Sequence, residues 1–357
     1  MQYETSLSLE QAIIGCLLGT AVGDAMGLPF EGLSKHRQKK WVKDRDRYYF
    51  FFNKGMVSDD TEHACMVAQS LIVSAGHESK FTRTLAWRLR FWLLCLPAGV
   101  GFATLRSLLK LWLGFSPHQS GVFSAGNGVA MRSPIVGVCY GDNIEKLRSL
   151  VRISTRMTHS DPKAEYGAFA IAIAAYFSSR QQVDPDLYYQ SLQANLDPKA
   201  VEFFALIKKA CQSAIAGESA GSFARYIGCD RGISGYIYRT VPVVIQVWLR
   251  HPQNYARGIQ EIIALGGDTD TTAAILGGII GASVGKIGIP QHWQQDLWEI
   301  ARSQTWIESV GKRLTIAIIE KTPNIAIPLS IPKLLLRNFF FLCLVLGHGF
   351  RRLFPPY

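Results

Sequence analysis

Two short acidic motifs contain the residues of this chain that are best suited to chemistry. Residues 58–62 read SDDTE and residues 266–271 read GGDTDT, so each motif combines aspartates with hydroxyl side chains. A helix-like apolar pattern follows both motifs. Helix capping explains one carboxylate per helix, because an N-cap side chain accepts a hydrogen bond from the first backbone N–H groups. Capping does not explain closely paired aspartates at two places.

A divalent-metal site is the alternative to capping. Crowded carboxylates raise one another's pKa values unless a cation lies among them. Oxygen ligands without a histidine or cysteine pattern suit Mg²⁺ or Mn²⁺ better than zinc. If the two motifs meet, they could hold two ions about 3.5–4 Å apart. The candidate ligands are Ser58, Asp59, Asp60, Asp268, Asp270 and Thr271. Composition alone leaves the metal and capping interpretations almost level.

Four further motifs are weak when each is taken alone. They are residues 15–32 with Asp24 and Glu31, 124–134 with Asn127 and Arg132, 155–168 with Thr158 and His159, and 232–242 with Tyr236. Gly-Asn-Gly is a common turn, and a lone histidine is more often structural than catalytic. Arg132 has apolar neighbours, which favours a buried structural arginine over a phosphate ligand.

Taken together and in this order, the motifs resemble those of the ADP-ribosylglycohydrolase family. The resemblance covers roughly residues 9–297 and rests on the order G-D-A-x-G, S/T-D-D-T, G-N-G-x-A-M-R, T-H and G-G-D-T-D-T. As a set, this order is highly specific. The resemblance implies an all-helical fold, a dinuclear Mg²⁺ or Mn²⁺ centre, and removal of ADP-ribose from modified side chains.

The resemblance also implies roles for single residues. The six candidate ligands match the family's metal ligands, with Ser58 in place of the commoner threonine. Glu31 stands where many members carry a mobile acidic residue, so Glu31, or else Asp59 or Asp60, would handle the proton. The surroundings of ADP-ribose would be Gly126, Asn127, Gly128, His159 and Tyr236, with the tyrosine stacked on adenine.

Apolar periodicity predicts the helices that must position these residues. Apolar residues recur every three or four positions over residues 11–25, 61–75, 82–96, 164–178, 198–216, 255–265 and 271–284. No series of alternating strands is evident. We therefore predict an all-α fold, with one orthogonal multi-helix domain over residues 8–322 and a hydrophobic tail over residues 323–357. The small residues after Thr271 would let a central helix approach its neighbours closely.

The tail contains an apolar run over residues 338–350, flanked by Arg337, Arg351 and Arg352. A membrane-spanning helix needs about 20 apolar residues, so this run is too short. We expect the tail to pack on the domain; the alternative is peripheral membrane contact through residues 334–357. Deleting the residues after Ser330 is expected to leave hydrolysis intact and to change solubility or membrane association.

Composition limits compartment and partners. The chain has 357 residues, 48% of them hydrophobic and 18% charged, which is typical of a globular protein. Seven cysteines without a C-x-x-C pair, and no secretory signal at the N-terminus, predict a cytoplasmic protein. The net charge of +11 favours an anionic ligand. We interpret the basic, aromatic-flanked residues 35–47 as a solvated loop and expect no nucleic-acid partner.

The sequence thus predicts a Mg²⁺- or Mn²⁺-dependent hydrolase. Its substrate would be ADP-ribose linked to a protein arginine or serine, or a small ADP-ribosyl derivative. The alternative is a non-catalytic member of the same fold, either a metal- and ADP-ribose-binding module or a crystallin-like structural protein. The intact acidic motifs favour the enzyme, because a purely structural role would not need both.

Overall fold

The computed structural model describes residues 7–33, 35–41 and 44–351, and this part of the chain is helical without a β-strand. The α-helices are α1 (Leu9–Gly27), α2 (Lys35–Trp41), α3 (Asp59–Ser74), α4 (Glu78–Leu94), α5 (Phe102–Trp112), α6 (Pro134–Tyr140), α7 (Ile144–Arg156), α8 (Pro162–Ser179), α9 (Pro185–Asn195), α10 (Val201–Ile215), α11 (Ala220–Tyr226), α12 (Ile237–Arg250), α13 (Tyr255–Ile263), α14 (Thr269–Val284), α15 (Gln291–Gln295), α16 (Gln304–Ile319) and α17 (Ile331–Arg351). Two short 3₁₀ helices are η1 (Leu28–Phe30) and η2 (Asn127–Arg132). The predicted all-α class is confirmed.

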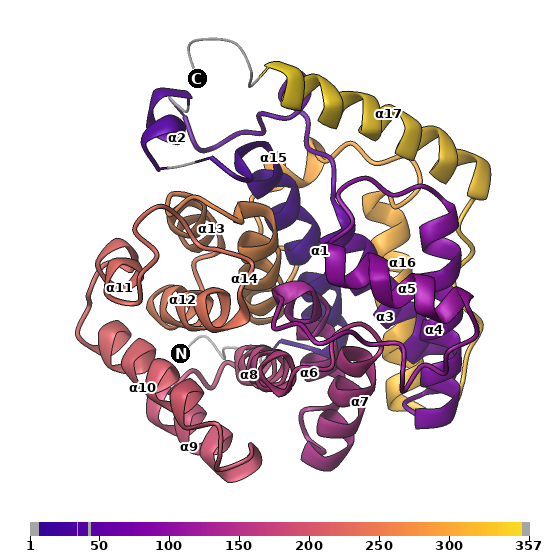
Figure 1. Cartoon of the computed structure of the whole chain (residues 1–357), viewed down its shortest axis with the longest axis horizontal. Coiled ribbons are helices and arrows are strands. Elements are labelled where there is room, and N and C mark those ends of the chain that lie inside the picture. Colours follow the sequence, from indigo (N-terminus) through magenta and orange to yellow (C-terminus); the bar gives the residue numbers. More distant parts are fainter. Residues whose placement is uncertain (1–6, 34, 42–43, 352–357) are drawn as a thin grey trace, which may run out of the picture.

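Helices α1 and α14 form the centre of the molecule and touch along their whole length (Figure 1). Their contact depends on glycines four residues apart on α1. A Cβ atom at Gly19 would lie 2.2 Å from the carbonyl oxygen of Gly277, and one at Gly23 would lie 2.2 Å from that of Ala273. Any side chain would therefore force the two backbones apart. The predicted close approach of this small-residue helix is confirmed.

The other helices surround this pair. Helices α8, α12 and α13 pack on α14, whereas α3 and α16 pack on α1, so the pair is buried on all sides (Figure 1). Because α3 and α14 both begin beside the C-terminal end of α1, the two acidic motifs meet at one end of the central pair. The fold thus joins motifs that lie about two hundred residues apart in sequence.

All seven predicted helices are present, with ends that differ by a few residues. The interpretation of residues 35–47 as a loop is wrong in its first half, because Lys35–Trp41 form α2; residues 42 and 43 lie outside the described part. Several amphipathic helices were not predicted. One of them is α12, which contains Pro242 and continues through it.

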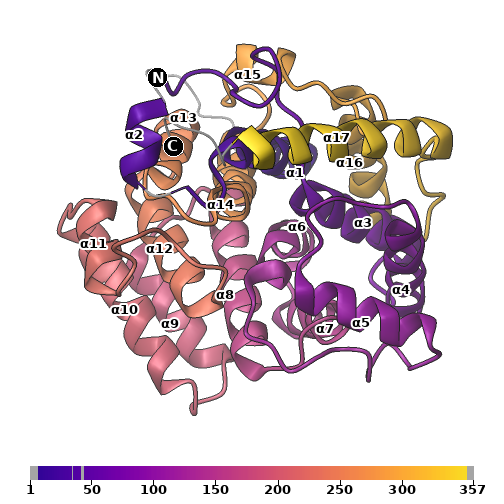
Figure 2. The same cartoon turned by 45° about the horizontal axis from the view of Figure 1, so that its top comes forward.

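The tail forms α17, which packs on the domain through Leu334, Arg337, Asn338 and Phe341 (Figure 2). Two helical segments are long and apolar enough to cross a membrane: 9–30, whose apolar window is fully buried, and 331–351, whose window is 22% buried. The packing of α17 agrees with our expectation for the tail, and peripheral membrane contact is not borne out. Arg352 lies outside the described residues.

Candidate active site

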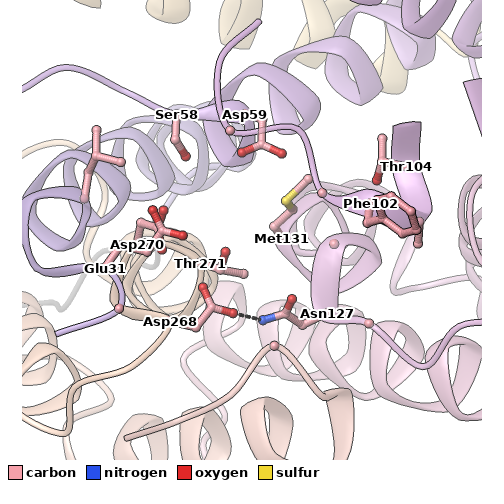
Figure 3. A pocket seen from close by; sticks show the side chains of 18 of the residues that line it. Glu31, Ser58, Asp59, Phe102, Thr104, Asn127, Met131, Asp268, Asp270 and Thr271 are labelled. Atoms are coloured by element: carbon pink, nitrogen blue, oxygen red, sulfur yellow. Dashed lines mark hydrogen bonds between the residues drawn. The ribbon is translucent and has the colours of Figure 1, made fainter. Parts of the chain in front are cut away.

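The two acidic motifs line a cleft of about 660 Å³, which we call the central cleft. Figure 3 shows Ser58 and Asp59 on one side of its floor and Glu31, Asp268, Asp270 and Thr271 on another. Across the cleft lie Asn127, Met131, Phe102 and Thr104. The structure thus brings together most of the residues that the sequence predicted for the site. Those that line the cleft are Glu31, Ser58, Asp59, Gly126, Asn127, Gly128, His159, Asp268, Asp270 and Thr271.

The first acidic motif is held in place by Asp24, which was not among the predicted site residues. Asp24, fully buried on α1, accepts hydrogen bonds from the backbone N–H of Ser58 at 2.9 Å and from the hydroxyl of Thr61 at 2.5 Å. Burial raises the pKa of Asp24 to about 7. Ser58 is the N-cap of α3, and its hydroxyl accepts from the backbone N–H of Asp60. The serine, rather than either aspartate, therefore caps α3.

The second motif is positioned by a glycine turn. Gly266 and Gly267 both have positive φ angles, of 74° and 86°, a conformation that glycine adopts without strain. Their backbone groups bond to Leu33 and Ile233 on two neighbouring loops. Asp268 is the N-cap of α14, yet its side chain makes no capping bond. Its carboxylate instead accepts from the amide nitrogen of Asn127 at 2.6 Å (Figure 3). Capping therefore does not account for Asp268.

The two motifs touch through Asp60. One of its carboxylate oxygens, Oδ2, accepts from the hydroxyl of Ser58 at 3.0 Å and from that of Thr271 at 3.2 Å. Asp60 is almost fully buried beneath the floor, so it does not line the cleft itself. Oδ1 of Asp60 and Oδ1 of Asp270 are both buried without a hydrogen-bond partner. Buried polar atoms normally have a partner, so these two oxygens need an explanation.

The electrostatics of the floor are strongly unfavourable to its negative charges. Burial, followed by the charges of neighbouring acids, raises the pKa values of Asp59, Asp60 and Asp270 well above the usual range. Glu31 contributes to the raised pKa of both Asp59 and Asp270, so its carboxylate lies within electrostatic reach of both motifs. A positive charge at the floor would relieve this repulsion.

The side chains of the floor fit a hard divalent cation by their chemistry. Carboxylate and hydroxyl oxygens are the donors that Mg²⁺ and Mn²⁺ prefer, and the free Oδ1 atoms of Asp60 and Asp270 are ready acceptors. Within the described part of the chain, no three acidic, histidine or cysteine side chains converge closely enough to ligate one ion together. The donors thus surround the floor, and hydroxyls or solvent must complete any coordination sphere.

The opposite wall is built on a buried arginine. Arg132 is fully buried, with its pKa lowered by burial to about 10, and it donates to the hydroxyl of Thr158 at 2.7 Å. That hydroxyl is 2.9 Å from Nδ1 of His159. Burial also lowers the pKa of His159 to about 3, so the imidazole is neutral near pH 7. Arg132 is therefore structural, and through Thr158 it orients the histidine beside Gly126.

Tyr236 is the one predicted site residue that lies outside both the cleft lining and the floor. Its hydroxyl accepts from Lys163 at 2.9 Å, whereas the preceding Ser234 and Gly235 do line the cleft. The sequence analysis assigned no role to Asp24 below the floor, and it did not identify several residues of the cleft wall, among them Phe102, Thr104, Met131, Phe341 and Val345. Asp24 had a signal, namely a carboxylate within a helix of small residues.

The fold and this acidic cleft agree with the comparisons to known proteins. The sequence profile of the ADP-ribosylglycohydrolase family matches residues 5–324, so the chain belongs to the ADP-ribosylglycohydrolase family. Members of this class are enzymes that hydrolyse ADP-ribose linkages. The match ends before α17 begins.

The chain is similar to two relatives with known activities. The ADP-ribosylhydrolase ARH3 of Gallus gallus is 26% identical, covering 83% of this chain and 91% of the relative. A glycohydrolase of ADP-ribosyl-dinitrogen reductase from Rhodospirillum rubrum is 23% identical, covering 82% and 92%. A solved ADP-ribosylglycohydrolase-related protein complex superimposes with a TM-score of 0.63 at 23% identity, over 86% of this chain and 97% of that one, which supports the fold.

Proposed function

We propose that the protein is a Mg²⁺- or Mn²⁺-dependent hydrolase that cleaves the glycosidic bond between ADP-ribose and an arginine or serine side chain of a modified protein. The observation that carries this proposal is the pair of buried, unpartnered carboxylate oxygens on Asp60 and Asp270, at the junction of the two motifs. Two cations are the proposed cofactors, held by Ser58, Asp59, Asp60, Asp268, Asp270 and Thr271.

The floor suits the charge that this reaction develops. Glycosidic hydrolysis passes through an oxocarbenium-like transition state, with positive charge on the ribose ring. Asp59 and Asp268 line the cleft, and with the proposed cations bound their ionised carboxylates would face a ribose placed there. The hydrogen bond from Asn127 fixes the orientation of Asp268. When bound, a divalent cation supplies Lewis acidity toward water and the ribose hydroxyls.

Glu31 is the proposed proton-transfer group. It follows η1 on an exposed turn, lines the cleft, and acts electrostatically on both Asp59 and Asp270. A carboxylate in this place takes the proton of the attacking water or returns a proton to the leaving side chain. Of the two alternatives, Asp59 and Asp60, Asp59 is the second candidate, because it lines the cleft whereas Asp60 lies beneath the floor.

The wall opposite the floor is the proposed site for the rest of ADP-ribose. In the turn at Gly126–Gly128, the backbone N–H groups of Gly126 and Gly128 are the proposed donors to the diphosphate, because the N–H of Asn127 between them already donates to the carbonyl oxygen of Gly235 at 2.9 Å. The neutral imidazole of His159 lies beside this turn. Tyr236 lies at the rim, so its proposed stacking on adenine would take place outside the described cleft lining.

Release of ADP-ribose from purified substrates tests the proposal. Proteins modified at arginine or at serine are incubated with the enzyme plus Mg²⁺, Mn²⁺ or a chelator, and free ADP-ribose is measured by chromatography. We expect cation-dependent release, reduced about 10²–10³-fold in Glu31→Gln. The matched control is Glu145→Gln, an exposed glutamate of α7 that lies away from the cleft.

Two outcomes would contradict the proposal. Release that continues fully in chelator would remove the cations from the mechanism. Binding of ADP-ribose without release from any substrate would favour the non-catalytic alternative.

For the compartment, we propose a reducing one such as the cytoplasm, since all seven cysteines are free thiols and six of them are buried or half-buried.

A further inference from the structure

Helix α17 borders the same cleft as the acidic motifs. Its side chains Phe341 and Val345 line the central cleft, next to Leu28 of η1 and Ala98 of the loop after α4. These four residues form an apolar wall beside the floor. The family match ends at residue 324, so this wall is partly made by a helix outside the matched region.

Arg337 joins α17 to the first acidic motif. Its side chain is 3% exposed, and its guanidinium donates to the carbonyl oxygen of Val57. The same guanidinium donates to both carboxylate oxygens of Glu299, at 2.5–3.1 Å. Glu299 in turn accepts from the backbone N–H of Val57 at 3.0 Å. Both polar backbone groups of Val57 are therefore fixed by one buried ion pair, immediately before Ser58 and Asp59.

A second set of contacts holds α17 against Leu28, which precedes Glu31, and against residues 50–56, which precede the first acidic motif. Phe341 is 2% exposed and packs in a small apolar cluster with Leu28, Phe50 and Met56. Near the helix end, Nε2 of His348 is 2.7 Å from the carbonyl oxygen of Phe50, and the two rings stack at 5.1 Å. The helix therefore touches the segments that lead to Glu31 and to Asp59, two of the acidic side chains that line the cleft.

We infer that α17 contributes one wall of the active site and that Arg337 is a positioning residue for Ser58 and Asp59. This inference rests on the proposed function of the same site. Arg337 acts through Val57, because fixing the carbonyl and the N–H of that residue sets the direction in which the chain enters α3. Phe341 and Val345 close one side of the cleft and limit what can enter beside the floor.

Arginine is suited to this place by its geometry. A planar guanidinium can bind a carboxylate through two N–H groups and still donate to a carbonyl, whereas a lysine ammonium is a point charge. The guanidinium carbon of Arg337 also lies 4.3 Å from the ring centre of Phe341, which ties the ion pair to the apolar wall. If α17 positions the floor in this way, deleting the residues after Ser330 should lower hydrolysis, which is the opposite of the outcome expected from the sequence.

The test compares Arg337→Gln and Arg337→Lys with Lys333→Gln, an exposed position on the same helix. Three properties are measured at a temperature where each protein is folded: hydrogen exchange in a peptide that covers residues 56–62, Mn²⁺ affinity by calorimetry, and kcat/KM for release of ADP-ribose. We expect Arg337→Gln to exchange faster in that peptide while α12 is unchanged, and to lose about 10–100-fold in Mn²⁺ affinity and kcat/KM. Arg337→Lys should recover part of each loss.

A remote core variant separates positioning from general destabilisation. Leu192→Ala opens the core at α9, far from the floor in sequence and outside the cleft lining. If Arg337→Gln loses no more Mn²⁺ affinity or protection of residues 56–62 than Leu192→Ala, the inference is wrong. The exchange and Mn²⁺ measurements need no turnover. Altered exchange in Arg337→Gln with no hydrolysis by the wild type would therefore reject the proposed function and leave the positioning role standing.

Discussion

Helix α3 takes part in two groups of buried charge that are organised in opposite ways. At its N-terminus, Asp59 and Asp60 belong to the acidic floor; only a few residues on, Glu62 points into a second group, which we call the paired cluster. The paired cluster contains two acids and two arginines, Glu62, Glu299, Arg302 and Arg337, all buried. Arg302 bonds Glu62 at 2.5 Å and Arg337 bonds Glu299 at 2.5 Å. Its charges cancel.

The floor has no such balance. Within residues 7–33, 35–41 and 44–351, none of Asp24, Asp59, Asp60, Asp268 and Asp270 forms a salt bridge. A buried acid without a positive partner destabilises the fold, so it persists where function needs it. In the paired cluster, each buried acid thus has an arginine partner from the protein itself. Among the described residues, the floor has no positive side chain to balance its acids, and the proposed cations would supply that charge.

Removing acids from the floor should have the largest effect. In Asp268→Asn with Asp270→Asn, we expect kcat/KM to fall about a thousandfold, or ~4 kcal/mol of transition-state stabilisation. The cation-free protein should be no less stable than the wild type, because two mutually repelling charges are gone. Turnover and thermal melts with and without Mg²⁺ check both points, with Glu145→Gln as the control. A large loss of stability without cation would mean that the floor is structural.

Removing one partner of the paired cluster should affect stability instead. Arg302→Met leaves Glu62 buried beside Trp92 and without its arginine at 2.5 Å. The free energy of unfolding should fall by about 3–5 kcal/mol, measured by denaturant titration. The matched control is Arg180→Met, which breaks an exposed ion pair with Asp142 and should change stability by less than about 1 kcal/mol. Equal effects would show that the two groups do not differ as described.

Changing pH without any substitution should give the smallest effect. Burial raises the folded-state pKa of Asp24 to about 7, whereas an unfolded aspartate titrates near about 3.9. The folded protein therefore keeps a proton that the unfolded chain releases, and stability is lost as pH rises toward 7. Between pH 6 and 7 we expect Asp24 to contribute a loss of about 1 kcal/mol in chelator, to which the raised pKa values of Asp59, Asp60 and Asp270 add in the same direction, with Mg²⁺ reducing the loss. A melting temperature independent of pH, with chelator present, would contradict this account.

The sequence predicted the parts of this molecule that depend on local pattern. Apolar periodicity located α1 and α14, and the order of the motifs located both halves of the floor. The sequence did not predict α12, because Pro242 and a run of β-branched residues have low helix propensity. Tertiary packing stabilises this helix nevertheless. The helix at Lys35–Trp41 was interpreted as a loop because its residues are mostly basic and show no apolar periodicity.

The missed parts of the site depend on contacts between distant residues. Arg337 meets Val57 across 280 residues, and no spacing rule connects a tail arginine with a backbone carbonyl so far away. The family resemblance places Tyr236 beside ADP-ribose; in the structure its loop reaches the cleft, whereas its hydroxyl accepts a hydrogen bond from Lys163. Tertiary packing determines which side chain of a loop faces a ligand. The local sequence of the loop does not predict this orientation.

The glycine contact between α1 and α14 also sets an order of events during synthesis. Gly27 and Thr269, which touch at the end of this contact, are 242 residues apart in the chain. At a ribosomal rate of about 5–20 residues per second, α1 waits roughly 12–50 s for its partner. Throughout that time the apolar segment of α1, with its glycine-lined face, has no α14 to pack against. The central helix pair, and with it the junction of the two acidic motifs, can therefore form only late in synthesis.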